Sequence, residues 1–125
     1  MYGMQSMSSD HAEVRSMISA LSGKVHGCTE SLSAQNVGNA LYGMQSMSSD
    51  HAEVRSMISA LSGKVHGCKE SLSAQEVGNA LFGMQGMSSD HAVVRSTISA
   101  LSGKVCSNIS ILAIQIISRY SVYCM

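Results

Sequence analysis

The side chains best suited to contact a ligand recur at a helical spacing in two stretches of the chain. We call these residues the polar ladder: Gln35, Asn39 and Tyr42, and 40 positions later Gln75, Asn79 and Phe82. Residues at i, i+4 and i+7 share one face of a helix. Side-chain amides can hydrogen-bond to base edges, and an aromatic ring can stack on a base of single-stranded RNA. The alternative interpretation is structural, with the amides bonded between adjacent repeats and the rings packed at the seam.

One position beside the polar ladder changes between the two stretches, from Asn36 to Glu76. A residue that selects a ligand should vary within a constant framework, so this position is a candidate for specificity. The alternative is helix capping. Each residue follows a serine, Ser33 or Ser73, by three positions, and Ser-x-x-Glu is the capping-box pattern.

One arginine per repeat forms a second candidate set, the arginine ladder, which consists of Arg15, Arg55 and Arg95. Guanidinium groups at a constant spacing could follow the phosphates of a nucleic acid. Three contacts to a single strand would make log K fall with log salt at a slope of only about −2. The alternative is that each arginine pairs with acidic neighbours such as Asp10 and Glu13 on a solvent-exposed face.

Residue types that bind metals occur in two His-Gly-Cys motifs, at His26 with Cys28 and at His66 with Cys68. A structural zinc site needs four ligands that converge on one ion. Two ligands per repeat, separated by a whole repeat, converge poorly, and the third copy carries Cys106 at the histidine position. We therefore predict no metal site.

The consecutive residues Ser9, Asp10 and His11 include the three residue types of a hydrolase triad. Consecutive residues cannot converge as nucleophile, base and orienting group, so a helix cap explains them better. The sequence also lacks a glycine-rich phosphate loop. It predicts no catalytic residues, no cofactor and no small-molecule substrate, and we do not expect an enzyme.

These candidate residues belong to a segment that recurs with a 40-residue period. Residues 1–40 and 41–80 differ only at Met1/Leu41, Thr29/Lys69 and Asn36/Glu76, and residues 81–105 continue the pattern. A fixed period of this length indicates stacked repeats. Residues 106–125 keep the register weakly and are predicted to form a degenerate C-terminal helix. Since residues 1–7 match only the second half of a helix, we expect a fragment of a longer array.

Each repeat is predicted to be a hairpin of two antiparallel helices. The first helix covers about residues 34–47, with Ser33 as its N-cap, and its Gly38 and Gly43 imply that another helix packs closely on it. Asp50 is predicted to cap the second helix, and Gly67 to end it in the left-handed conformation. The chain is therefore expected to be a single all-α domain, an α-solenoid of about three antiparallel helical hairpins.

The composition favours a reduced protein outside the membrane. The formal net charge is +0. The chain therefore lacks the excess of basic residues that is usual in nucleic-acid-binding proteins. The longest apolar run, residues 109–117, is too short to span a bilayer. Cys28 and Cys68 occupy one repeat position, beyond disulfide reach, which favours an intracellular, reducing compartment. No targeting segment is visible at the N-terminus.

The segment L-S-A-Q-[NE]-V-G-N-A-L-[YF]-G-M, at residues 32–44 and 72–84, resembles the octotricopeptide-type repeats of organellar RNA-metabolism proteins. The matching positions in the first copy are Leu32, Gln35, Val37, Asn39, Leu41 and Tyr42. The longer period, the absence of proline and the neutral charge depart from the pattern of that family. The resemblance implies an α-solenoid that binds single-stranded RNA in a chloroplast or mitochondrion.

We therefore expect a non-catalytic helical-repeat binding module with one of two kinds of partner. Single-stranded RNA would contact the polar ladder, Asn36, Glu76 and the arginine ladder. The alternative is a protein or peptide held by a scaffold with an apolar groove rich in methionine, of which the chain has 10. A concave face lined by amides and arginines would favour RNA over a protein partner.

Overall fold

The computed structural model describes residues 2–105, and this part of the chain is all-α. A short 3-10 helix, η1 (Tyr2–Met4), precedes five α-helices, which are α1 (Ala12–Gly27), α2 (Ala34–Tyr42), α3 (Ala52–Gly67), α4 (Ala74–Gly83) and α5 (Ala92–Lys104). The described residues contain no strand, only an isolated parallel bridge between Leu72 and Val105. The helix predicted for residues 106–125 lies outside the described residues.

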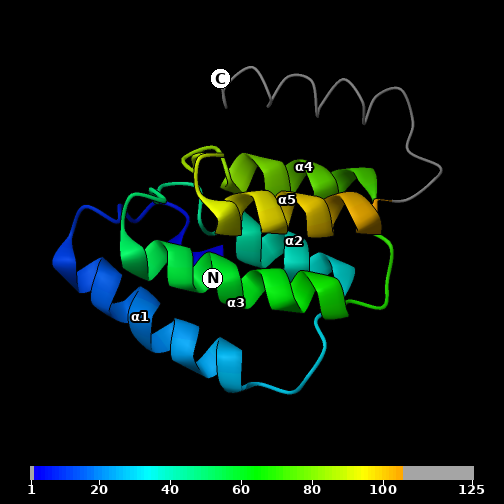
Figure 1. The fold of residues 1–125 in the computed structure, drawn as a ribbon, viewed down its shortest axis with the longest axis horizontal. Coiled ribbons are helices and arrows are strands. Elements are labelled where there is room, and N and C mark those ends of the chain that lie inside the picture. The colour runs from blue at the N-terminus through cyan, green and yellow to red at the C-terminus, as the bar shows by residue number, and fades with distance from the viewer. Residues whose placement is uncertain (1, 106–125) are drawn as a thin grey trace.

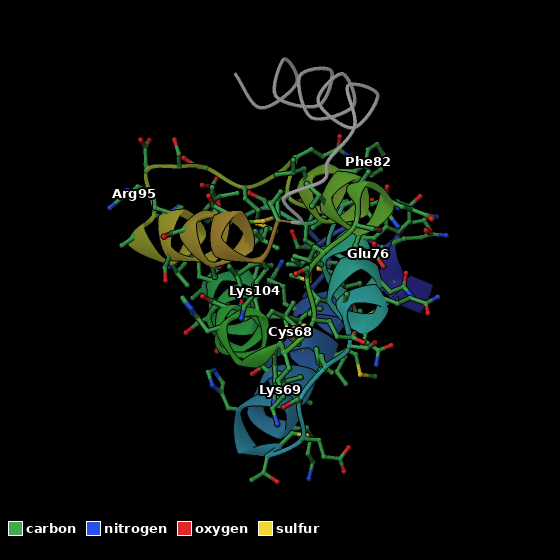
Figure 2. All side chains as sticks on the ribbon, turned by 90° about the vertical axis from the view of Figure 1, so that its right-hand side faces the viewer. Cys68, Lys69, Glu76, Phe82, Arg95 and Lys104 are labelled. Carbon is green, nitrogen blue, oxygen red and sulfur yellow. The ribbon has the colours of Figure 1, made fainter. Side chains whose placement is uncertain are left out.

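The helices pack in two rows (Figure 1). In one row α3 lies between α1 and α5, and in the other α4 packs on α2, which also contacts η1 and α3. Long and short helices alternate along the chain. Equivalent helices of successive copies lie side by side, α3 beside α1 and α5, and α4 beside α2. In the turned view of Figure 2, α2 and α4 lie on the right and α5 lies on the left.

A continuous hydrophobic cluster joins the two rows. It includes residues from all five described α-helices, among them Ile18, Val37, Ile58, Val77 and Leu101. The buried methionines Met44, Met47, Met84 and Met87 enter it from the turns that follow α2 and α4. The core is therefore made largely by contacts between helices of successive 40-residue copies.

Hydrogen bonds between successive copies recur at the repeat spacing. Ser9 Oγ accepts from the backbone N–H of Ser48 at 2.9 Å, and Ser49 Oγ accepts from that of Ser88 at 2.8 Å. Lys104 Nζ donates to the carbonyl of Cys68 at 2.7 Å, as Lys64 does to that of the equivalent Cys28. These polar contacts fix how successive copies align along the helix rows. Apolar packing alone is less directional and would define this alignment less precisely.

The close packing predicted over Gly38 and Gly43 is confirmed at Gly38, whereas Gly43 lies just after the end of α2 as its C-cap. A Cβ atom added at Gly38 would lie 3.2 Å from the Cα atom of Glu76 in α4. The absence of a side chain allows the two backbones to approach each other, which offsets the helix-propensity cost of about 1 kcal/mol for glycine against alanine.

The predicted C-terminal end of the first helix, at residue 47, is wrong. α2 ends at Tyr42, and the next bonds run to carbonyls three residues back, from Met44 N to Leu41 and from Met47 N to Met44. Such tight turns place residues three apart on the same side. Met44 and Met47 are both buried in the core at the end of these turns.

The predicted caps of the second helix are also wrong. α3 begins after His51 rather than Asp50, and the Asp50 N–H donates to Ser48 Oγ at 3.2 Å. Arg55 stabilises this turn by donating to the carbonyls of Ser49 and Asp50. At the other end, Gly67 is the last helical residue, and no described glycine has a positive φ. The chain leaves α3 in the extended conformation at Cys68.

The N-cap predictions for α2 and α4 are confirmed. Ser33 Oγ accepts from the backbone N–H of Asn36 at 3.2 Å. In α4, Glu76 Oε2 accepts from the backbone N–H of Ser73 at 3.0 Å, which is the returning bond of a capping box.

Candidate ligand-binding surface

Packing of α4 on α2 brings both halves of the polar ladder to one surface. The residues on α2 are Gln35, Asn39 and Tyr42, and those on α4 are Gln75, Asn79 and Phe82. Both helices span all three ladder positions, so the shared helical face predicted from the spacing is present. The surface therefore combines side chains from two successive repeats.

Two hollows lie between these side chains. The larger, of about 330 Å³, is lined by Asn39, Tyr42, Gln75 and Asn79. The smaller, of about 110 Å³, is lined by Gln35, Asn39, Gln75, Glu76 and Asn79. Amide side chains supply most of the lining of both, with Tyr42 in the larger hollow and the charged Glu76 in the smaller, so a ligand seated there would meet mainly hydrogen-bond donors and acceptors.

The four amides of the polar ladder, those of Gln35, Asn39, Gln75 and Asn79, make no hydrogen bond to other described residues. None of their polar atoms is buried, since the described residues contain no buried side-chain nitrogen or oxygen without a partner. They therefore do not pair between repeats as the structural alternative requires. Each amide keeps one donor group and one acceptor directed to solvent.

Amides do pair between repeats at a different position, in the turns after η1, α2 and α4. Gln45 Nε2 donates to Gln5 Oε1 at 3.5 Å, and Gln85 Nε2 donates to the carbonyl of Gln45 at 3.5 Å. These glutamines recur at the repeat period within M-Q-[SG]-M. The period could have identified them, and Gln45 lies within the helix predicted for residues 34–47, but they were not among the predicted contact residues.

The aromatic residues of the polar ladder contact each other. The rings of Tyr42 and Phe82 are stacked, with centroids 5.5 Å apart and planes inclined by 22°. Both side chains are half-buried. This is the seam packing of the structural alternative, and it leaves only the outer part of the ring pair accessible to a base.

The two residues at the variable position have different surroundings. Glu76 accepts the capping bond from Ser73 and its backbone lies against Gly38, so its carboxylate has a structural role in the fold. Asn36 is exposed and lines another hollow of about 330 Å³, which also includes Leu32, Lys64 and the ladder residue Asn39. The variable position is therefore a capping position in α4 and an open one in α2.

The arginine ladder lies in the other row of helices and binds the chain itself. Arg15 donates to the carbonyls of Ser9 and Asp10 at 2.8 and 2.9 Å, and its Nε lies 3.9 Å from Glu53 Oε2. The same contacts to the loop carbonyls recur at Arg55, at 2.8 and 3.0 Å.

Arg95 keeps only one of these bonds, to the carbonyl of Ser89 at 2.7 Å. Figure 2 shows Arg95 on the side of the molecule away from Glu76 and Phe82. The fold thus separates the arginine ladder from the polar ladder, and the two do not form one face.

The residues considered for metal binding or catalysis do not assemble into a site. Within residues 2–105 no three His, Cys, Asp or Glu side chains are placed to hold a metal ion. Cys28 and Cys68 are both free thiols, the first exposed and the second buried. Ser9 and Asp10 contact the next repeat instead, through Ser9 Oγ and through Asp10 Oδ1, which lies 3.5 Å from His51 Nε2.

Among the described helices, none is both long and apolar enough to cross a bilayer. Comparison of the chain with models of known families, with curated proteins and with solved structures finds no match.

Proposed function

We propose that the chain is a non-catalytic binding module, an α-solenoid of antiparallel helical hairpins with a 40-residue period. Support comes from the contacts that repeat at this spacing. Equivalent serines, lysines and arginines make equivalent bonds in successive copies, and equivalent helices lie side by side. Solenoids of this kind present extended surfaces on which each repeat offers the same groups to a ligand.

We propose single-stranded RNA as the ligand of the polar ladder. The observation that carries this proposal is the set of four unpaired amides that line the two hollows between α2 and α4. Amide groups can match the donor and acceptor pattern of base edges, and unstacked bases offer those edges in single strands. The resemblance of residues 32–44 to octotricopeptide-type repeats agrees with this ligand and suggests an organelle as the compartment.

The charge distribution predicts that RNA binding by this surface is weak and depends little on salt. The formal net charge is +0, and Arg15 and Arg55 donate to loop carbonyls on the other row of helices. Phosphate contacts therefore contribute little. We expect weak binding whose salt slope is shallower than the value of about −2 that three arginine contacts would give.

The test is fluorescence anisotropy with a labelled pool of single-stranded RNA at low salt. Replacement of both ladder asparagines, Asn39→Ala with Asn79→Ala, should weaken binding about tenfold, since each lost hydrogen bond is worth about 0.5–1.5 kcal/mol. The matched control is Gln45→Ala, which removes an amide that is already bonded to Gln5. It should leave the affinity unchanged.

Two results would contradict the RNA proposal. One is the absence of binding by the unmodified chain at tens of micromolar protein. The other is an equal loss of affinity in the Gln45→Ala control and in the double asparagine variant, which would place the RNA away from the polar ladder.

A second candidate function, a protein-binding scaffold with a groove rich in methionine, is favoured by a different observation. A hollow of about 440 Å³ at the N-terminal end of the rows is lined by Met4, Met7, Glu13, Val14, Met17 and Leu21. Methionine side chains adapt to irregular apolar partners. This hollow lies at the end of the rows rather than along the polar ladder, so the two candidate ligands would not compete for one surface.

A further inference from the structure

At the N-terminal end of the helix rows, apolar side chains are exposed although their equivalents in the next copy of the repeat are buried. Met17 of α1 is 53% exposed, whereas its equivalent in α3, Met57, is 0% exposed. Met7 is 45% exposed, whereas its equivalent Met47 is 1% exposed. We call this hollow the N-face, and it is lined by one charged residue, Glu13, together with Met4, Met7, Val14, Met17 and Leu21. Inside the molecule the same positions are covered by the preceding repeat.

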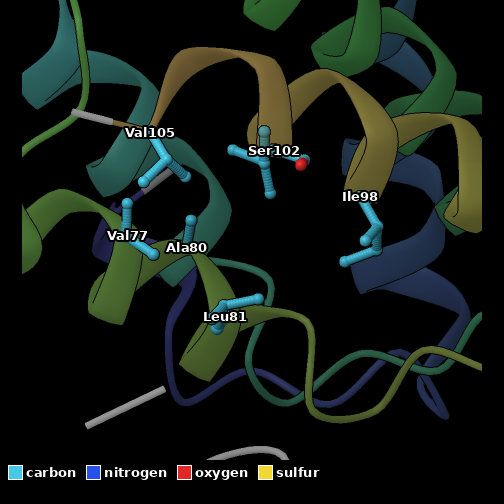
Figure 3. A pocket seen from close by; sticks show the side chains of 7 residues that line it. Val77, Ala80, Leu81, Ile98, Ser102 and Val105 are labelled. Atoms are coloured by element: carbon cyan, nitrogen blue, oxygen red, sulfur yellow. The ribbon is translucent and has the colours of Figure 1, made fainter. Parts of the chain in front are cut away.

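The second observation concerns the opposite end, where α4 and α5 present another apolar hollow (Figure 3). Ile98 of α5 is 41% exposed, whereas its equivalents Ile18 and Ile58 are 0% exposed. We call this surface the C-face, a hollow of about 200 Å³ lined by Val77, Ala80, Leu81, Ile98, Leu101, Ser102 and Val105. The contrast is carried by Ile98, whose equivalents the following repeat covers, whereas Val77, Ala80 and Leu101 at the base of the hollow are at most 5% exposed.

The two faces are the halves of one contact that the molecule already makes internally. Ile18 of α1 is at a C-face position and Met57 of α3 is at an N-face position. Both are fully buried, and α1 packs directly on α3. The same contact is made again between α3 and α5. We propose that the N-face of a second copy of this chain docks on the C-face of the first, so that α1 of the second copy packs on α5.

Polar groups at the two ends match in the same register. Ser89 is exposed although its equivalents Ser9 and Ser49 are buried and accept from the backbone of the next repeat. In the docked pair, Ser89 Oγ accepts from the backbone N–H of Ser8 of the second copy. In the same way Asp90 faces His11 of that copy, as Asp10 faces His51 at 3.5 Å within the chain.

The remaining match joins the turns. Gln85 Nε2 donates to the carbonyl of Gln45, so the carbonyl of Gln85 is placed to accept from Gln5 of the second copy. The formal net charge of +0 also means that no general repulsion opposes the association of two copies. The occupant is therefore this chain itself, because it carries both the apolar and the polar halves of the contact.

The contact joins two different faces, so it is heterologous and each added copy leaves one N-face and one C-face open. The full chain should therefore form a series of oligomers that lengthens with protein concentration. This proposal does not depend on RNA binding, because the polar ladder is not part of either face.

Sedimentation velocity on the full chain tests the proposal with one variant for each face. Met17→Glu places a charge in the N-face, and Ile98→Glu places one in the C-face. Both side chains are exposed in the single molecule, so both variants should fold, which far-ultraviolet circular dichroism checks. Each variant alone should associate at least about 100-fold more weakly than the unmodified chain, because a carboxylate buried at an apolar contact is strongly unfavourable.

The decisive measurement is an equimolar mixture of the two variants. The intact C-face of Met17→Glu can bind the intact N-face of Ile98→Glu, and both outer faces of that pair are blocked. The mixture should therefore stop at the dimer. Ser19→Glu and Ser99→Glu are the controls, because both serines are exposed on α1 and α5 outside the two hollows. They should associate like the unmodified chain.

Three results would overturn the proposal. The first is an unmodified chain that remains monomeric at every concentration, which would mean that something other than a second copy covers the faces. The second is a dimer in either variant alone at the concentration of the unmodified chain, which would indicate contact between like faces. The third is a mixture of the two variants that forms no dimer.

Discussion

Gly83 of α4 lies so close to Leu41 of α2 that a Cβ atom at position 83 would overlap the Leu41 carbonyl oxygen. The clash would be with backbone, which cannot move aside as the end of a flexible side chain can. This contact sets the separation of the two helices that carry the polar ladder. The stability of the fold and the geometry of the ladder therefore depend on the same glycine.

Replacement of Gly83 by alanine should destabilise the chain by about 3 kcal/mol, the upper range for overpacking. The matched control is Gly63→Ala in α3, where nothing lies within 4 Å of the added Cβ atom. That variant should be stabilised by up to about 1 kcal/mol through helix propensity. Urea unfolding followed by circular dichroism measures both, and a loss of stability in Gly63→Ala would contradict this account.

Ser49→Ala should destabilise the chain by about 1–3 kcal/mol, because it leaves the backbone N–H of Ser88 without its partner. Ser89→Ala changes the same repeat position where the side chain is exposed, and it should have no measurable effect. Thermal unfolding at a low protein concentration, where association is negligible, compares the two. Equal effects would show that the bond between repeats contributes nothing to stability.

The capping box of α4 can be transferred to α2. Asn36→Glu should add the bond that Glu76 makes to Ser73 and stabilise the chain by about 0.5–1 kcal/mol. The reverse change, Glu76→Asn, should destabilise it by a similar amount. Midpoints of urea unfolding measure both changes. A destabilised Asn36→Glu together with a stabilised Glu76→Asn would contradict the capping role. The specificity role would then be the better explanation of the variation at this position.

Arg55→Ala should reduce stability more than Arg95→Ala does. Arg55 donates to two loop carbonyls and is partly buried, whereas Arg95 donates to one and is exposed. A hydrogen bond to a charged group is worth about 1.5–3 kcal/mol where it is buried and less where solvent screens it. We expect a difference of about 1 kcal/mol in unfolding free energy.

The same two arginine variants also separate a structural role from phosphate binding. If the arginine ladder only holds its loops, neither variant should change RNA affinity or its salt slope at concentrations where the chain remains folded. A loss of affinity of equal size in both, with a shallower salt slope, would assign the arginines to the RNA instead.

Local features were predictable because local rules govern them. The all-helical fold follows from the recurring helical spacing, and the caps at Ser33 and Ser73 follow from the residue types at positions three apart. The shared face of Gln35 and Asn39 follows from the geometry of a single helix. None of these features requires knowledge of what packs on the helix.

Features that depend on neighbours were not predictable. α2 ends at Tyr42 although Met44 and Met47 continue the helical spacing, so the apolar pattern does not mark where the helix ends. The separation of the two ladders follows from the assignment of alternate helices to different rows, and no local pattern states that assignment. The binding of Arg15 to loop carbonyls likewise depends on how the preceding loop folds back on α1.

Met17 and Met57 show this limit most directly. Both stand in the sequence AEVRSMISA, so every local rule treats them alike. Yet Met17 is 53% exposed and Met57 is 0% exposed. The sequence by itself determined the repeat and the helices, since these depend on interactions a few residues apart. Only the tertiary structure decided which copies of the repeated surface are covered, because burial depends on the presence of a neighbour in space.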